Sequence, residues 1–245
     1  MIEVVQLVKS FHDRKRGQVK AVDGVSFTCQ PGEIFGLLGV NGAGKTTTLR
    51  ILATLLKPTA GTARVSGADV IERPEEVRRQ VGFLSTATAL YGRLTAQEMV
   101  EYFGRLNGLS EVLLRDRIER LFTRLAMNEF RHGRCDKLST GQKQRVSIAR
   151  TLVHDPQVMI FDEPTNGLDV LAARTIVQFI RECREQGKTV IFSSHVMSEV
   201  ARLCDRIAII HHGRMCVTGT VAELRNHFGI DDLEEVFVKA VEGMV

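Results

Sequence analysis

The feature that most constrains this chain is a nearly continuous apolar run, residues 34–38, that leads directly into a glycine-rich segment. Such a run, without polar alternation, is typical of a central strand in a parallel sheet that helices cover on both faces. Residues 46–56 then follow a helical pattern, so a strand, a glycine loop and a helix are predicted in succession. The loop fits the pattern G-x-x-x-x-G-K-[ST] and consists of Gly39, Val40, Asn41, Gly42, Ala43, Gly44, Lys45 and Thr46.

This loop predicts a binding site for the phosphates of a nucleotide. Its three glycines allow backbone conformations closed to other residues, so successive N–H groups can point inward around phosphate oxygens. The positive end of the following helix adds to the attraction. We expect Lys45 to bridge the β- and γ-phosphates, the Thr46 hydroxyl to hold Mg²⁺, and Thr47 to reach the α-phosphate.

A second apolar run, residues 158–161, ends in two carboxylates, Asp162 and Glu163. Open α/β sheets bind their ligands at the carboxyl ends of the strands, so these side chains are expected near the glycine loop. We expect Asp162 to bind Mg²⁺ directly or through water, and Glu163 to polarise the water that attacks the γ-phosphate.

The sequence as a whole predicts an α/β fold with a mainly parallel sheet, because short β-type runs alternate with helical patterns. The expected strands are residues 2–8, 25–29, 34–38, 63–65, 81–84, 158–161, 190–193 and 207–210. No strand is expected among the helical patterns at residues 95–106, 111–127 and 141–154, which predicts an inserted helical subdomain at about 86–155. One domain is predicted over 1–230, and 231–245 are expected to form a short C-terminal helix.

Composition excludes several classes of protein. The 44% of hydrophobic and 25% of charged residues are average for a chain with a single core, which argues against disorder and coiled coils. No stretch approaches the roughly 18–20 apolar residues of a membrane-spanning helix, and no secretory signal begins the sequence, so an intracellular location is expected. The net charge, 33 − 29 = +4, is carried by scattered basic residues and gives nucleic-acid binding only weak support.

The cysteines are expected to be reduced structural thiols, because they are odd in number, widely spaced and without a C-x-x-C pair. They are Cys29, Cys135, Cys183, Cys204 and Cys216. His211 and His212 lie near Cys216 in the sequence, but no further ligand has the spacing of a zinc site, so no metal is predicted there.

Residues 138–145, Leu-Ser-Thr-Gly-Gln-Lys-Gln-Arg, resemble the signature motif of the ATP-binding cassette (ABC) ATPases, which that family writes L-S-G-G-Q. The resemblance covers about residues 2 to 225 and implies a P-loop NTPase-like cassette with an antiparallel β part. It also implies that two cassettes pair head to tail, so that the signature of one covers the ATP held by the other. The residues implied in that contact are Ser139, Thr140, Gly141 and Gln142, with Thr140 in place of the family's first glycine. An ordinary N-capped helix is the alternative explanation for this segment.

Other parts of the chain extend the resemblance. Asp169 looks like the D-loop aspartate that crosses the dimer interface, and His195 looks like the switch histidine that contacts the γ-phosphate. Phe11 matches the aromatic position on which the family stacks adenine, and core packing is its alternative role. The resemblance thus implies ATP and Mg²⁺ as cofactors and Lys45, Glu163 and His195 as catalytic residues.

The sequence departs from the family after the strand expected at 81–84. The family usually has a Gln there that contacts Mg²⁺ and the attacking water, whereas residues 85–88 read Ser-Thr-Ala-Thr. Thr86 is the nearest positional equivalent, which makes its hydroxyl a further candidate for Mg²⁺ binding.

Residues 82–85 and 90–98 are similar to the cassette subunits of sodium-efflux exporters, whose membrane subunit is a separate polypeptide. This similarity implies an ATPase subunit that couples dimerisation to efflux, with sodium ions as the candidate cargo. Its implied partners are a second copy and a polytopic membrane permease, which would hold it on the inner face of the cell membrane; no nucleic acid is expected.

A surface for the permease is expected on residues 85–103, with Arg93 and Glu98 as exposed charges, although core packing also explains several of its apolar residues. Those apolar residues are Leu90, Tyr91, Leu94, Met99, Tyr102 and Phe103.

Three other functions compete with transport. Ribosome-associated cassettes are expected to carry two tandem copies, and DNA-repair cassettes are interrupted by long coiled coils. Here each motif occurs once, and no heptad run of that size separates Lys45 from Leu138. A non-enzymatic, ATP-gated binding module would release no phosphate.

Overall fold

The computed structural model describes residues 1–13, 17–85 and 89–243 of the chain. The strands are β1 (Ile2–Asp13), β2 (Gly17–Cys29), β3 (Ile34–Leu38), β4 (Ala60–Val65), β5 (Ala68–Asp69), β6 (Val81–Ser85), β7 (Val158–Asp162), β8 (Thr189–Ser194), β9 (Arg206–His211) and β10 (Arg214–Gly219). The α-helices are α1 (Lys45–Leu52), α2 (Pro74–Gln80), α3 (Ala96–Leu106), α4 (Glu111–Arg124), α5 (Thr140–Leu152), α6 (Val170–Glu185), α7 (Met197–Leu203), α8 (Val221–Phe228) and α9 (Leu233–Glu242).

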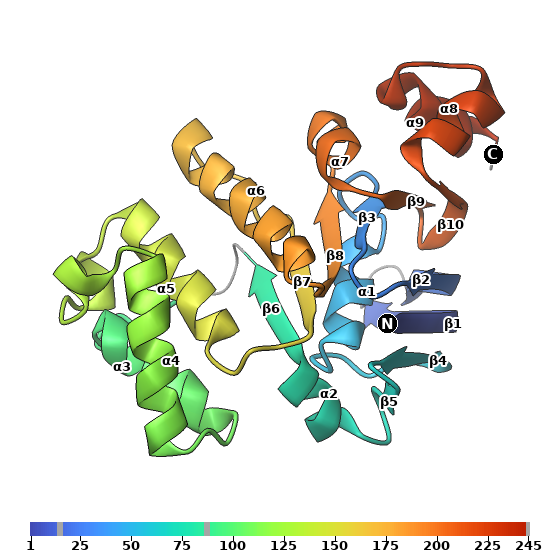
Figure 1. Ribbon diagram of the computed structural model, residues 1–245. Helices are drawn as coiled ribbons and strands as arrows, with labels where there is room; N and C mark the ends of the chain where they lie inside the picture. The colour runs from blue at the N-terminus through green and yellow to red at the C-terminus, as the bar shows by residue number, and fades with distance from the viewer. Residues whose placement is uncertain (14–16, 86–88, 244–245) are drawn as a thin grey trace.

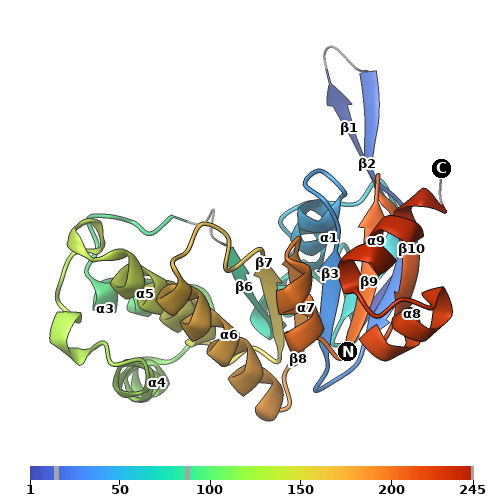
Figure 2. The same cartoon turned by 90° about the horizontal axis from the view of Figure 1, so that it is seen from above.

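These strands form two sheets. The larger has the order β10-β9-β3-β8-β7-β6, in which only β10 is antiparallel to its neighbour. The smaller, with the order β2-β1-β4-β5, is antiparallel throughout, and Figure 2 shows its β1–β2 hairpin projecting beyond the rest of the molecule. The predicted α/β fold, with a mainly parallel core and an antiparallel part, is confirmed.

The strands β3, β7 and β8 are buried along their whole length. This burial explains their continuous apolar sequences, because helices or other strands cover both faces of the sheet. The strands are parallel and adjacent in the order β3-β8-β7, so their carboxyl ends lie at one edge. Each of them is followed by a polar segment that the sequence analysis singled out.

The core has two layers on either side of the parallel sheet. On one face, α1 packs between the two sheets, with Leu49, Ile51 and Leu52 fully buried. On the other face, α6, α7, α8 and α9 share a cluster that includes Ile180 and Val236. Helix α9 is thus part of the core, and it lies within the segment expected to form a C-terminal helix.

Helices α3, α4 and α5 stand together beyond β6, at the edge of the sheet (Figure 1). They have a separate apolar cluster that includes Met99, Phe122 and Val146. Thr95 begins α3 with a capping box, since its hydroxyl accepts from the Glu98 N–H while the Glu98 carboxylate accepts from the Thr95 N–H. This cap explains why α3 begins one residue later than predicted.

Several boundaries differ from the predictions for local reasons. Helix α4 ends at Arg124 rather than 127, and Ala126 has a left-handed φ of 49° that no helix accommodates. Helix α1 similarly ends at Leu52, shortly before Thr54 with a φ of 59°. Strand β10 was not predicted, because its half-buried residues lack a clear apolar pattern.

His154 follows α5, in a groove between the helices and the sheet. Its Nε2 lies 3.0 Å from the Val81 carbonyl oxygen, and its buried Nδ1 has no hydrogen-bond partner among the described residues. Burial lowers the pKa of His154 below its ordinary value, and the nearby Arg117 guanidinium acts in the same direction. The folded protein therefore favours the neutral imidazole.

This environment predicts a loss of stability in acid. Below the ordinary histidine pKa of about 6.5, the unfolded chain binds a proton that folded His154 resists, so the free energy of unfolding falls by up to about 1.4 kcal/mol per pH unit. Urea unfolding between about pH 5 and pH 7.5 should show that the free energy of unfolding depends less on pH in His154→Gln than in the parent protein. His227→Gln, which removes an exposed imidazole from α8, is the matched control, and an unchanged slope in His154→Gln would contradict this role.

Candidate nucleotide-binding site

The glycine loop fills the space between β3 and α1, where two positions leave no room for a side chain. A Cβ atom at Gly39 would lie 2.5 Å from the carbonyl oxygen of Ile210. At Gly44 it would lie 2.4 Å from the carbonyl oxygen of Ala21, and Gly44 has a left-handed φ of 106°. Both glycines are therefore needed for the loop to pack against β9 and β2.

The loop borders a cavity of about 330 Å³ at the start of α1. The residues that line it are Ala21, Asn41, Gly42, Ala43, Gly44, Lys45, Thr46, Thr47 and Glu163. The positive end of the α1 dipole and the free N–H groups of its first turn face this region, so the cavity suits an anion. The structure thus gathers most of the predicted loop residues, whereas Gly39 packs beneath the cavity and Val40 is exposed beside it.

Lys45 is the cation of this cavity, and its side chain is only 3% exposed. Its Nζ donates to the carbonyl oxygens of Gly39, at 2.6 Å, and Val40, at 3.1 Å. The same Nζ lies 3.1 Å from Glu163 Oε1. The lysine therefore ties the start of its own loop to the carboxylate that follows β7.

The hydroxyl of Thr46, which lines the cavity, contacts the buried carboxylate of Asp162. Thr46 Oγ1 donates to Asp162 Oδ1 at 2.9 Å. A hydroxyl and a carboxylate oxygen are hard donors of the kind that Mg²⁺ prefers, and Mg²⁺ usually completes its shell with water and substrate phosphates. The pair therefore fits a Mg²⁺ ion that accompanies a nucleotide, whereas Thr86 lies outside the described residues.

Glu163 faces the cavity from a strained backbone, with a left-handed φ of 46°. Its Oε2 lies 3.3 Å from His195 Nδ1 and accepts from Asn166 Nδ2 at 3.4 Å. The segments that follow β3, β7 and β8 thus bring Lys45, Glu163 and His195 together, although Lys45 lies more than a hundred residues before the other two in the sequence.

The signature residues lie elsewhere, at the exposed start of α5. The Ser139 hydroxyl accepts from the Gln142 N–H at 3.3 Å, and the Gln142 side chain accepts from the Ser139 N–H at 2.9 Å. Both side chains therefore cap the helix, which agrees with the simpler explanation of this segment. Thr140 and Gly141 are exposed beside them, and a Cβ atom at Gly141 would meet open space.

Two further predicted residues also lie outside the cavity lining. Asp169 precedes α6, and its Oδ1 accepts from the Ala172 N–H at 2.9 Å. Phe11, on β1, is 41% exposed, and the Lys9 ammonium lies 5.1 Å from its ring centroid. This exposure excludes core packing as the role of Phe11.

Sequence reasoning missed two residues at the site. Asn166 contacts Glu163, as described above, and Ser193 Oγ donates to Asp162 Oδ1 at 2.9 Å. A signal for Ser193 was present, because it is the one polar residue of the strand expected at 190–193. The contact itself depends on the pairing of β7 with β8, which the sequence does not specify.

Comparisons with known proteins identify the family of this chain. The pattern of the ABC transporter family matches residues 22–166, more than half of the chain, and a pattern described as "AAA domain, putative AbiEii toxin, Type IV TA system" matches residues 134–201. The "ABC transporter ATP-binding protein NatA" of Bacillus subtilis (strain 168) is 42% identical over 246 residues, with 100% of both chains covered. The "Nod factor export ATP-binding protein I" of Paraburkholderia xenovorans (strain LB400) is 39% identical over 234 residues, which cover 95% of this chain and 75% of that protein.

A solved structure shares the fold. It is the dimer of the ATP-binding cassette MJ0796 in a post-hydrolysis state bound to ADP and Pi, with a TM-score of 0.79 and 26% identity over 90% of this chain and 98% of that one. Within the described part of the present chain, no helix is long and apolar enough to cross a membrane. The family match and the full-length relative together show that this chain belongs to the ABC transporter family, as one of its ATP-hydrolysing cassettes.

Proposed function

We propose that this chain is the ATPase subunit of an exporter, in which two copies bind Mg·ATP and act on a separate membrane permease. The observation that carries the proposal is the convergence of Lys45, Asp162, Glu163 and His195 at one edge of the parallel sheet. Its relative in Paraburkholderia bears an export name, which supports the direction of transport. The similarity of residues 82–85 and 90–98 to sodium-efflux cassettes makes Na⁺ the first solute to test in efflux from vesicles.

The roles of the cavity residues follow from their contacts. As the triphosphate enters, its oxygens replace Glu163 and the loop carbonyls as partners of Lys45. Thr46 and Asp162 would hold Mg²⁺, which would neutralise charge on the β- and γ-phosphates. Glu163 is then free to take a proton from the attacking water, while His195, beside it, reaches the γ-phosphate.

The proposal includes a second copy, because the exposed signature residues Ser139, Thr140 and Gly141 do not line the chain's own cavity. Nothing within the described monomer requires glycine at position 141, where the φ is ordinary and a Cβ atom would be free. A close approach by another molecule explains that glycine, and the start of α5 is suited to the γ-phosphate held by a partner. Asp169 and the exposed Phe11 retain their proposed places at the dimer interface and on adenine.

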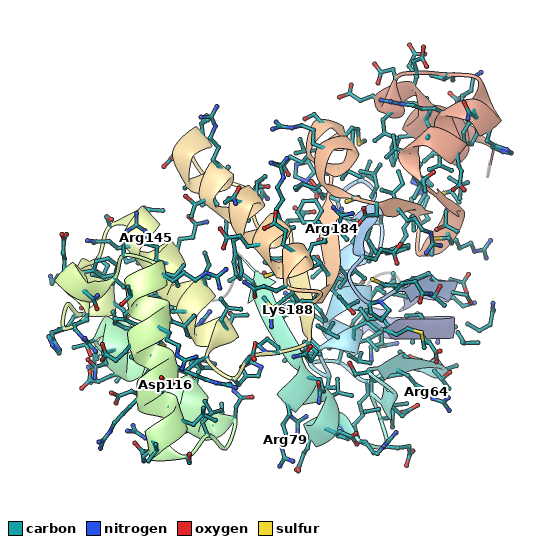
Figure 3. The ribbon with its side chains drawn as sticks, viewed as in Figure 1. Arg64, Arg79, Asp116, Arg145, Arg184 and Lys188 are labelled. Atoms are coloured by element: carbon teal, nitrogen blue, oxygen red, sulfur yellow. The ribbon has the colours of Figure 1, made fainter. Side chains whose placement is uncertain are left out.

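A groove of about 1090 Å³ lies between the sheet and the helical subdomain, and we assign it to a cytoplasmic helix of the permease. Its lining includes Phe103 and Leu106 of α3, Arg150 of α5, and Arg78 and Arg79 of α2. Arg79 is labelled on α2 in Figure 3. Bound there, the chain would lie on the inner face of the cell membrane.

Part of the predicted permease surface needs correction. Met99 is fully buried in the subdomain core and cannot contact a partner, whereas Tyr91 and Tyr102 are exposed. The Glu98 carboxylate accepts from both the N–H and the hydroxyl of Thr95, so reversing its charge would also damage the start of α3. Leu106, 67% exposed, is a cleaner position for a test.

The first prediction concerns the general base. Glu163→Gln should lower the rate of ATP hydrolysis by about 10² to 10⁴, because general-base assistance is typically worth that much. ATP affinity should be retained, since Lys45 remains and loses only a competing carboxylate. Phosphate release and equilibrium ATP binding measure the two effects, and hydrolysis at the parent rate would show that Glu163 is not the base.

The second prediction concerns the partner copy. Gly141→Asp should leave the monomer folded and able to bind ATP, because the new side chain meets open space. Hydrolysis should fall by about 10² or more, because a carboxylate would face the γ-phosphate of the other copy. Combined with Glu163→Gln, it should also abolish the ATP-dependent dimer in sedimentation experiments; a dimer that persists would rule out this contact.

The third prediction concerns the permease. Leu106→Glu should reduce permease-stimulated hydrolysis and efflux by about tenfold or more, as expected for a hot-spot side chain. Basal hydrolysis should not change. Val112→Glu is the matched control, because Val112 is 82% exposed on α4 and does not line the groove. Equal coupling in the two variants would place the permease elsewhere.

A further inference from the structure

Ser193 is a fully buried polar residue near the end of the central strand β8. In the parallel register it lies opposite Leu37 of β3 on one side and Asp162 of β7 on the other. It therefore lies between the strand that leads into the glycine loop and the strand that delivers the two carboxylates. The two residues before it in β8, Ile191 and Phe192, are apolar and fully buried, whereas Ser194, which follows it, is also a buried serine.

The Ser193 hydroxyl is shared between the two carboxylate residues. Its Oγ donates to Asp162 Oδ1 at 2.9 Å and accepts from the backbone N–H of Glu163 at 3.0 Å. The same N–H also points to the Ser193 carbonyl oxygen, at 3.2 Å. A hydroxyl can donate to one residue and accept from the next at the same time, because it carries one donor hydrogen and two acceptor lone pairs on one small atom.

These bonds act on a strained segment. The left-handed φ of Glu163 is unfavourable for a residue with a side chain, so surrounding contacts must hold it. The φ angle sets the direction in which the Glu163 carboxylate leaves the backbone, and the hydrogen bond on its N–H restricts that angle.

A second consequence concerns Asp162. Both Thr46 and Ser193 donate to the same oxygen, Oδ1. If Thr46 and Asp162 held Mg²⁺, the bond from Ser193 would still orient the Asp162 carboxylate. Polar groups that hold metal-binding carboxylates in this way typically change metal affinity or activity by about 10- to 100-fold when they are removed.

We propose that Ser193 is a positioning residue for hydrolysis, which sets the orientation of Asp162 and the backbone angle of Glu163 through one hydroxyl. The inference rests on the proposed roles of those two carboxylates. It predicts a specific defect in which turnover and Mg²⁺ dependence change together while nucleotide affinity does not, because Ser193 does not reach the nucleotide cavity.

The test compares Ser193→Ala with Thr189→Val in the full-length chain. Thr189 is the matched control, because it is a buried residue with a hydroxyl at the opposite end of the same strand. Among the hydrogen bonds described for it, its Oγ1 accepts only from the amino group of Met1. Phosphate release gives kcat, the KM for ATP and the Mg²⁺ concentration at half-maximal rate. Ser193→Ala should lower kcat by about tenfold or more and raise the Mg²⁺ requirement by a similar factor, with the KM for ATP within about threefold. Thr189→Val should match the parent in all three.

Two further variants guard against a simple folding defect. Ser193→Cys fills the same space with a weak donor and should reproduce the loss, even where Ser193→Ala fails to fold. Ser193→Thr keeps the hydroxyl and should restore most of the rate.

The inference is overturned if the folded Ala or Cys variant keeps the parent kcat and Mg²⁺ requirement. It is also overturned if kcat, ATP affinity and Tm decline together in Ser193 and Thr189 variants alike. Glu163→Gln, assayed in parallel, separates this result from the proposed function. An active Glu163→Gln refutes the role of Glu163, whereas an inactive Glu163→Gln beside a fully active Ser193→Ala refutes only the role of Ser193.

Discussion

The burial of three adjacent parallel strands is the constraint on which the rest of this structure depends. Because β3, β8 and β7 are covered on both faces, their residues are apolar along almost their whole length. Polar groups can therefore collect only where these strands end. The parallel arrangement places all three carboxyl ends at one edge, so the glycine loop, the two carboxylates and the histidine meet there.

Within this edge, the charged groups are partners of one another. Lys45 is almost fully buried, and an unpaired ammonium there would be costly, so Glu163 and two loop carbonyls act as its partners. The same lysine and carboxylate are the groups that the proposed mechanism needs for the phosphates and for water. In the proposed mechanism, the phosphates of ATP would replace these partners of Lys45, so that occupancy of the cavity would free Glu163 to act as the base.

The helical subdomain adds a second level of organisation. Its separate core and capped helices give it a defined shape beside β6, and its exposed signature residues lie away from the chain's own cavity. The groove between the subdomain and the sheet is lined by both parts. A permease segment bound there would contact each part, so a change in their relative position on dimer formation would be transmitted to the membrane subunit.

Local sequence patterns were sufficient for much of this protein. The glycine loop, the apolar strands and the two carboxylates are each encoded over a few neighbouring residues, and the covalent chain and simple burial decide their conformation. The helix boundaries were predicted less accurately, because single residues such as Ala126 and Thr54, with left-handed backbone angles, end helices whose apolar pattern continues. Strand β10 escaped prediction because pairing with β9, rather than an apolar pattern, makes it a strand.

Contacts between distant segments were decided only by the tertiary structure. The ion pair between Lys45 and Glu163 and the hydroxyl of Ser193 between two carboxylates depend on the order β3-β8-β7, and no local pattern specifies which strands are neighbours. The requirement for glycine at positions 39 and 44 also depends on tertiary structure, because carbonyl oxygens of β9 and β2 occupy the space that a Cβ atom would need. The sequence alone thus established the chemistry of the groups at this site, whereas the packing of the sheet decided which of them touch.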